Sequence, residues 1–168
     1  MNAEKSITDS NKSVLGYFIL CITKKYFCFK GRARRKEYWS FMLFPILINL
    51  ALSFSTIVDG ISDNDINIIR GIVILVLLIP GFAVLFRRLH DINFSGLWGI
   101  APFLGMYIGG KMLIFAINGA NTGIAIILLF SQIITIISSF GFWAVFILTL
   151  FESDMKENKY GPIPEGVK

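Results

Sequence analysis

Two short clusters of charged side chains are the part of this sequence best suited to chemistry. Residues 31–39 read GRARRKEYW, and residues 87–91 read RRLHD. A guanidinium group forms strong paired hydrogen bonds with a carboxylate or a phosphate. The two clusters could therefore form ion pairs with each other or bind an anionic group.

The only histidine, His90, is followed directly by Asp91. One histidine beside one carboxylate falls short of the three or four ligands that a metal site needs. We expect this pair to cap a helix end and to orient a turn. We expect neither a metal nor a cofactor, and we assign no catalytic residue.

Long apolar stretches border both clusters. The chain is 55% hydrophobic and only 16% charged, where soluble proteins carry about 25% charged residues. A membrane-spanning helix needs about 20 apolar residues, and the predicted spans are 38–58, 71–86, 95–117 and 124–151. The sequence therefore predicts an all-α polytopic membrane protein with a bundle of four transmembrane helices.

The spans belong to a single predicted membrane domain, residues 14–164. In residues 14–29 the apolar side chains recur every three or four positions, which predicts an amphipathic helix. Two placements stay open for it, lying in the cytoplasmic interface or packing on the helix bundle. Residues 1–13 are predicted to be a disordered tail, and residues 152–168 a polar cytoplasmic tail.

Basic residues are distributed unevenly around the four spans. Nine lysines or arginines precede the first span, two separate the second from the third, and three follow the fourth; the exceptions are Arg70 and Lys111. The positive-inside rule then places both termini in the cytoplasm. Because the bases flank apolar spans, anionic lipid headgroups are the expected counter-charge of the net +5 chain, and no nucleic-acid partner is expected.

Three motifs resemble those of one family of small bacterial membrane proteins, known as domain of unknown function 805. Residues 31–39 are similar to its opening motif, and residues 87–91 with the nearby Trp98 to its second motif. Residues 158–162, NKYGP, are similar to its C-terminal motif. The resemblance implies a helical protein of the bacterial inner membrane and supplies a topology, but no mechanism.

The first two spans should form an antiparallel hairpin that brings the two charged clusters together. Each carboxylate then has two candidate arginines: Glu37 has Arg87 or Arg88, and Asp91 has Arg32 or Arg35. In one interpretation these ion pairs fix the register of the hairpin. In the other, an anionic headgroup or a partner binds to the basic and aromatic side chains, which are Arg32, Arg35, Arg87, Arg88, Trp39 and Trp98.

A few polar side chains lie inside the predicted spans. Asn49 lies in the first span, and Gln132 and Thr135 lie in the fourth. Such side chains normally hydrogen-bond between helices, although a hydrophilic pathway would look similar. Small residues spaced by four in the third span, at Gly105 and Gly109 for example, predict close packing against this bundle or another subunit.

Two functions follow as hypotheses. The leading one is a non-enzymatic membrane module that engages anionic lipid or a partner protein through its basic cytoplasmic face. The alternative is a small transporter or channel subunit that works as a homo-oligomer, suggested by Asn49, the polar side chains of the fourth span and the helix-breaking Pro80.

Overall fold

The computed structural model describes residues 12–58, 62–118 and 124–164, and in this part the chain is helical. The helices are α2 (Val14–Ile22), α3 (Arg35–Val58), α4 (Asp63–Asp91), α5 (Leu97–Asn118) and α6 (Ile124–Leu150). The last four are long and apolar enough to cross a membrane. Within the described residues the only β pairing is an isolated bridge between Asn158 and Gly161. The all-helical prediction with four spanning helices is confirmed.

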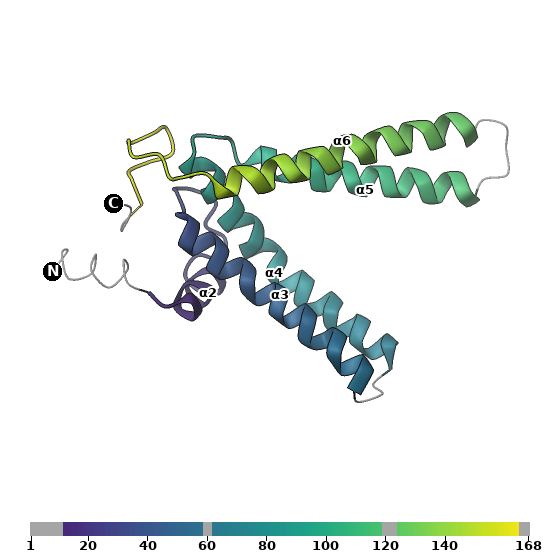
Figure 1. Cartoon of the computed structure of the whole chain (residues 1–168), viewed down its shortest axis with the longest axis horizontal. Helices are drawn as coiled ribbons and strands as arrows, with labels where there is room; N and C mark the ends of the chain where they lie inside the picture. The colour runs from purple at the N-terminus through teal and green to yellow at the C-terminus, as the bar shows by residue number, and fades with distance from the viewer. Residues whose placement is uncertain (1–11, 59–61, 119–123, 165–168) are drawn as a thin grey trace.

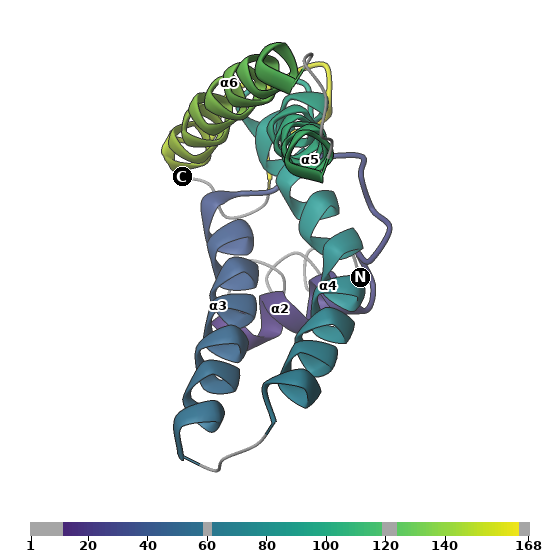
Figure 2. The same cartoon turned by 90° about the vertical axis from the view of Figure 1, so that its right-hand side faces the viewer.

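The four long helices form two hairpins, α3 with α4 and α5 with α6. The hairpins meet at one end, which we call the joined end, and diverge towards their other ends (Figure 1). Residues 151–164 lie at the joined end, beside the last turns of α4 and α6. The second view shows α2 crossing the α3–α4 hairpin (Figure 2).

Two helices differ in length from the apolar stretches that predicted them. Helix α4 begins at Asp63, well before residue 71, because the side chain of Ser62 accepts a hydrogen bond from the backbone N–H of Asn64 and caps the helix. Helix α2 ends at Ile22 rather than near residue 29. There the hydroxyl of Thr23 donates to the carbonyl of Ile19 at 2.6 Å, which closes the last turn.

Helix α2 packs on the α3–α4 hairpin through its aromatic face. The ring of Phe18 stacks on Phe44, with the ring centroids 4.3 Å apart, and also contacts Phe41. Tyr17 and Cys21 are buried. Of the two placements that the sequence left open, contact with the hairpin is present. Residues 1–11 of the predicted disordered tail lie outside the described residues.

The small residues of α5 lie against α6. A side chain added at Gly109 would place its Cβ 2.5 Å from the hydroxyl oxygen of Thr135 and 3.2 Å from the carbonyl oxygen of Ser131. A Cβ at Gly105 would likewise meet the hydroxyl of Ser138. The stripe of small residues is therefore used within this hairpin.

Candidate functional site

Five charged side chains from the two predicted clusters meet at the joined end. We call them the arginine cluster: Arg32, Glu37, Arg87, Arg88 and Asp91. Each is at most 8% exposed. Buried charges are costly unless they are paired and hydrogen-bonded, so the partners of each group decide what the cluster can do.

Asp91, in the last turn of α4, uses both of its carboxylate oxygens. Arg32 Nε lies 2.9 Å from Oδ1, and Arg88 Nη1 contacts Oδ2. Arg32 stands just before α3, so this pair ties the start of α3 to the end of α4. The sequence left Arg32 or Arg35 as the partner, and in the structure the partners are Arg32 and Arg88.

Glu37, in the first turn of α3, contacts Arg87 Nη1 from the end of α4. Lys25 Nζ lies 3.2 Å from the same carboxylate, so the segment after α2 joins the cluster. The thiol of Cys21 is also close, with Sγ 3.9 Å from Oε1 of Glu37. Burial, together with the Glu37 charge, raises the pKa of Cys21 to about 11, so the thiol is neutral at physiological pH.

The arginines also bind the end of α6, whose last carbonyls have no partner within the helix. Arg88 Nε donates to the carbonyl of Thr149 at 3.1 Å, and Nη2 donates to the carbonyl of Phe151. Arg35 donates to the carbonyl of Leu150 at 3.3 Å. A helix C-terminus carries partial negative charge, so these contacts also help to balance three buried arginines against two carboxylates.

The predicted C-terminal tail folds over the cluster. Arg32 Nη1 donates to the carbonyl of Lys156 at 2.7 Å, and Nη2 donates to the carbonyl of Asp154. The side-chain amide of Asn158 donates to the carbonyl of His90 at 2.9 Å. The segments at 31–39, 87–91 and 158–162, far apart in the sequence, therefore share one site.

His90 lies at the edge of this site. Its ring stacks on Tyr160, with centroids 3.8 Å apart, and its Nδ1 lies 3.2 Å from the carbonyl oxygen of Gly31. These contacts hold the C-terminal motif against the end of α4. In the described part of the chain no group of three or more His, Cys, Asp or Glu side chains could hold a metal ion.

The residues predicted to bind a headgroup or a partner differ in their burial. Arg32, Arg87 and Arg88 are buried and donate to acceptors of the protein itself. Arg35 is exposed over 48% of its side chain, and Trp98 is 63% exposed at the start of α5. Trp39 is half-buried, edge-on to Phe146 of α6.

The polar side chains inside the spans mostly bond to their own helices. Asn49 donates to the carbonyl of Pro45 at 2.9 Å, and Thr135 donates to the carbonyl of Ser131 at 2.8 Å. Gln132 is exposed on the surface of α6. These contacts satisfy Asn49 and Thr135 without a partner helix.

Sequence reasoning missed the contribution of residues 151–164. Most contacts of this segment with the arginine cluster are made by backbone carbonyl oxygens. Every residue has such an oxygen, so the residue types do not indicate these contacts. The one signal was the NKYGP motif at 158–162, whose Gly161 has a φ of 130°, a conformation that favours glycine.

Comparison with known proteins places this arrangement in a known family. The model of the family described as protein of unknown function, DUF805, matches residues 26–162. The inner membrane protein YhaI of Escherichia coli K12 is 31% identical over 107 residues, which cover 62% of this chain and 86% of YhaI. The inner membrane protein YhaH of the same organism is 38% identical over 96 residues, covering 53% and 77%. No solved structure matches the chain.

Proposed function

This chain belongs to the DUF805 family and is a multi-pass protein of the inner membrane, and from this premise we propose that it is a non-enzymatic module that engages anionic lipid headgroups through a basic cytoplasmic face. The buried arginine cluster then has a structural role. It joins both hairpins and residues 151–164 into one platform, and lipid binding belongs to the exposed bases around it.

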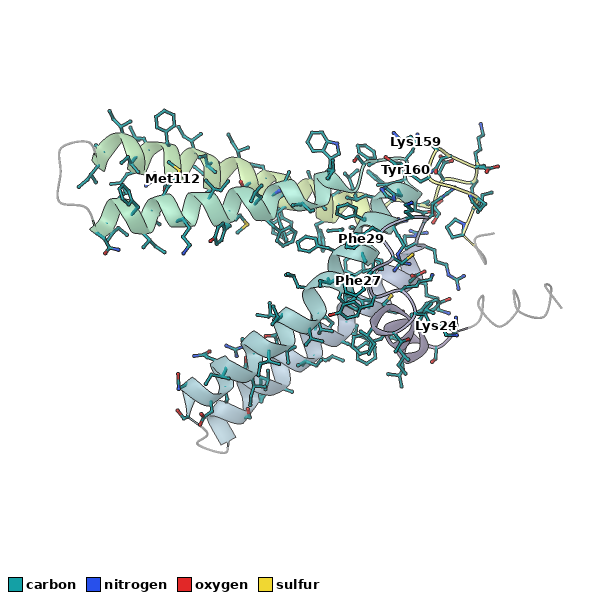
Figure 3. All side chains as sticks on the ribbon, turned by 180° about the vertical axis from the view of Figure 1, so that it is seen from behind. Lys24, Phe27, Phe29, Met112, Lys159 and Tyr160 are labelled. Carbon is teal, nitrogen blue, oxygen red and sulfur yellow. The ribbon has the colours of Figure 1, made fainter. Side chains whose placement is uncertain are left out.

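The observation that carries this proposal is a set of exposed bases at the joined end. We call them the basic rim: Lys24, Lys30, Arg35, Lys36, Lys156 and Lys159. Lys24 and Lys159 lie at this end, while Met112 lies at the far end of the α5–α6 hairpin (Figure 3). The exposed acids of residues 151–164 are Glu152 and Glu157, so the bases predominate.

The positive-inside rule supports a cytoplasmic position for the joined end. Arg70 and Lys111 are the bases that the long helices carry away from it. The cytoplasmic leaflet is negatively charged, and each base near its surface contributes about 1 kcal/mol of attraction. A rim of several bases would therefore retain anionic lipid around the protein.

Native mass spectrometry of the protein released from lipid nanodiscs tests this proposal. The nanodiscs contain phosphatidylcholine and phosphatidylglycerol, and the rim variant replaces Lys24 and Lys159 with glutamine. The matched control replaces Arg70 and Lys111, at the other end, with glutamine. We expect phosphatidylglycerol to be retained by the wild type and the control and to be lost from the rim variant.

Two outcomes would contradict this proposal. If the wild-type protein retained phosphatidylglycerol no better than phosphatidylcholine, specific engagement of anionic lipid would be excluded. A second protein could co-purify with the wild type and be lost from the rim variant while the retained lipid stays the same. The partner of the basic rim would then be a protein and not a lipid.

Gln132 favours the alternative function, a transporter or channel subunit that works as an oligomer. Its amide is exposed on an apolar helix, and such a group in lipid gains by hydrogen bonding to another helix. Disulfide formation by Gln132→Cys in native membranes would detect this contact. Solute flux in proteoliposomes that is lost in Gln132→Leu would support a pathway, and a monomer without flux would exclude it.

A further inference from the structure

An apolar cavity of about 480 Å³ lies between the two hairpins, close to where they meet. Side chains from all four long helices line it, including Trp39 of α3, Phe82 of α4, Phe103 of α5 and Trp143 of α6. Aromatic contacts connect these walls; for example, the ring centroids of Phe82 and Phe103 are 5.4 Å apart. The cavity therefore forms where the two hairpins pack against each other.

The walls of this cavity are not covered by the protein. Trp143 is 60% exposed, and Phe103, Phe142 and Phe146 are between 36% and 42% exposed. All four belong to helices that are apolar enough to span a membrane. At that depth the surrounding medium is lipid hydrocarbon, so an acyl chain is the occupant that matches both the surface and its location.

An exposed cation lies next to the cavity. Arg35 precedes Trp39 by four residues in α3, so it stands one helical turn, about 6 Å, nearer the joined end. Its guanidinium lies 3.3 Å from a carboxylate oxygen of Glu152, which is 87% exposed just beyond the end of α6. An exposed ion pair of this kind is weak, so a phosphate can compete for Arg35.

We propose that the cavity between the hairpins holds one acyl chain of an anionic phospholipid whose phosphate binds Arg35. This inference rests on the proposed function, because it assigns a position to one of the lipids that the basic rim retains. The chain lies against Trp39 and Trp143, and the headgroup displaces Glu152 from Arg35.

Tryptophan fluorescence provides the test, because bromine atoms on an acyl chain quench a nearby indole. The chain has three tryptophans, and Trp98→Phe leaves only the two that line the cavity. The protein is reconstituted in phosphatidylcholine containing a small fraction of phosphatidylglycerol, with bromine on one lipid at a time. The measured quantity is the quenching by each brominated lipid relative to its mole fraction.

We expect brominated phosphatidylglycerol to quench about fivefold more than its mole fraction predicts, the preference that one base near an anionic group provides. Arg35→Gln should abolish this preference. Glu152→Gln should increase it, because that change removes the carboxylate competing for Arg35. These two side chains are exposed, so neither change threatens the fold.

A pair of glycines in α4 tests the cavity itself. Gly81 lines the cavity, and a Cβ there would meet only Phe41, at the ordinary contact distance of 3.6 Å, so Gly81→Leu adds a side chain where the cavity lies. Gly71 is exposed, and a Cβ there meets nothing within 4 Å, so Gly71→Leu is the matched control. We expect Gly81→Leu to remove the preference for phosphatidylglycerol and Gly71→Leu to keep it.

Quenching in proportion to mole fraction in the wild type would overturn this inference. A preference that survives both Arg35→Gln and Gly81→Leu would also overturn it, because the lipid would then lie elsewhere. In both cases phosphatidylglycerol still retained in native mass spectrometry would leave the basic rim as its binding surface. Wild-type protein that retains no phosphatidylglycerol in that experiment would, by contrast, remove the proposed function as well.

Discussion

The hydroxyl of Tyr26 donates a hydrogen bond of 2.7 Å to the carbonyl oxygen of Val76, near the middle of α4. Val76 lies four residues before Pro80, and proline has no N–H to give the hydrogen bond that this carbonyl would receive in a regular helix. A carbonyl without a donor is costly inside a membrane. The segment after α2 therefore completes a helix that belongs to the first hairpin.

We expect Tyr26→Phe to lower the free energy of unfolding by about 1–2 kcal/mol, because the Val76 carbonyl loses its donor. Pro80→Ala restores an N–H to the helix, so the same change should cost much less in that background. Denaturation of the purified protein in mixed micelles measures all four members of this cycle. An equal cost in both backgrounds would show that the hydroxyl does not compensate for the proline.

Arg88 is predicted to be essential for stability. It contacts Asp91 and donates to two carbonyls at the end of α6, all with its side chain fully buried. Removing one partner of a buried ion pair typically costs about 3–5 kcal/mol, so Arg88→Gln should strongly lower the unfolding temperature. Arg35→Gln, at an exposed pair, should cost at most about 1 kcal/mol. Thermal unfolding that ranks the two variants equally would contradict this.

Gly109 and its neighbour Gly110 offer a matched pair in α5. A Cβ at Gly109 would crowd Thr135 and the backbone of Ser131, whereas one at Gly110 meets nothing within 4 Å. Gly109→Ala should therefore destabilise the α5–α6 hairpin by about 1–3 kcal/mol. Gly110→Ala should be neutral or stabilise it by up to about 1 kcal/mol. Proteolysis rates of the two variants in micelles would measure the difference.

The raised pKa of Cys21 predicts that the stability of the protein depends on pH in the alkaline range. Its pKa is raised from 9.0 to about 11 in the folded protein, so the unfolded chain loses the thiol proton first as pH rises. The contribution of the neutral Cys21 thiol to the free energy of unfolding is complete below pH 9. It is lost between about pH 9 and 11, by up to about 3 kcal/mol. Wild type should therefore lose stability relative to Cys21→Ala over this interval. Parallel pH profiles of the two proteins would refute it.

Much of the fold could be predicted because a membrane restricts what an apolar chain can do. Long uncharged stretches must be helices, and the charged clusters at 31–39 and 87–91 must lie outside the hydrocarbon, at the ends of the spans. From this the meeting of Glu37 and Asp91 with arginines of the other cluster followed directly. The periodicity of residues 14–29 likewise predicted a helix there, although it could not place its end.

The burial of the arginines could not be predicted in the same way. Sequence shows that Arg88 is charged, but its partners include the carbonyls of Thr149 and Phe151, which no residue type specifies. The bond from Tyr26 to Val76 is hidden for the same reason. The start of α4 was missed because residues 63–65 and Asn67 are polar, and only the cap at Ser62 marks them as part of the helix.

The contacts of Arg32 with residues 154–161 impose an order on biogenesis. Arg32 is translated more than a hundred residues before the carbonyls of Asp154 and Lys156 that it binds. Until those residues leave the ribosome, Arg32 lacks these two backbone acceptors. Closure of the fold at the joined end therefore waits for residues 154–161, and the first hairpin alone cannot supply every acceptor that Arg32 uses.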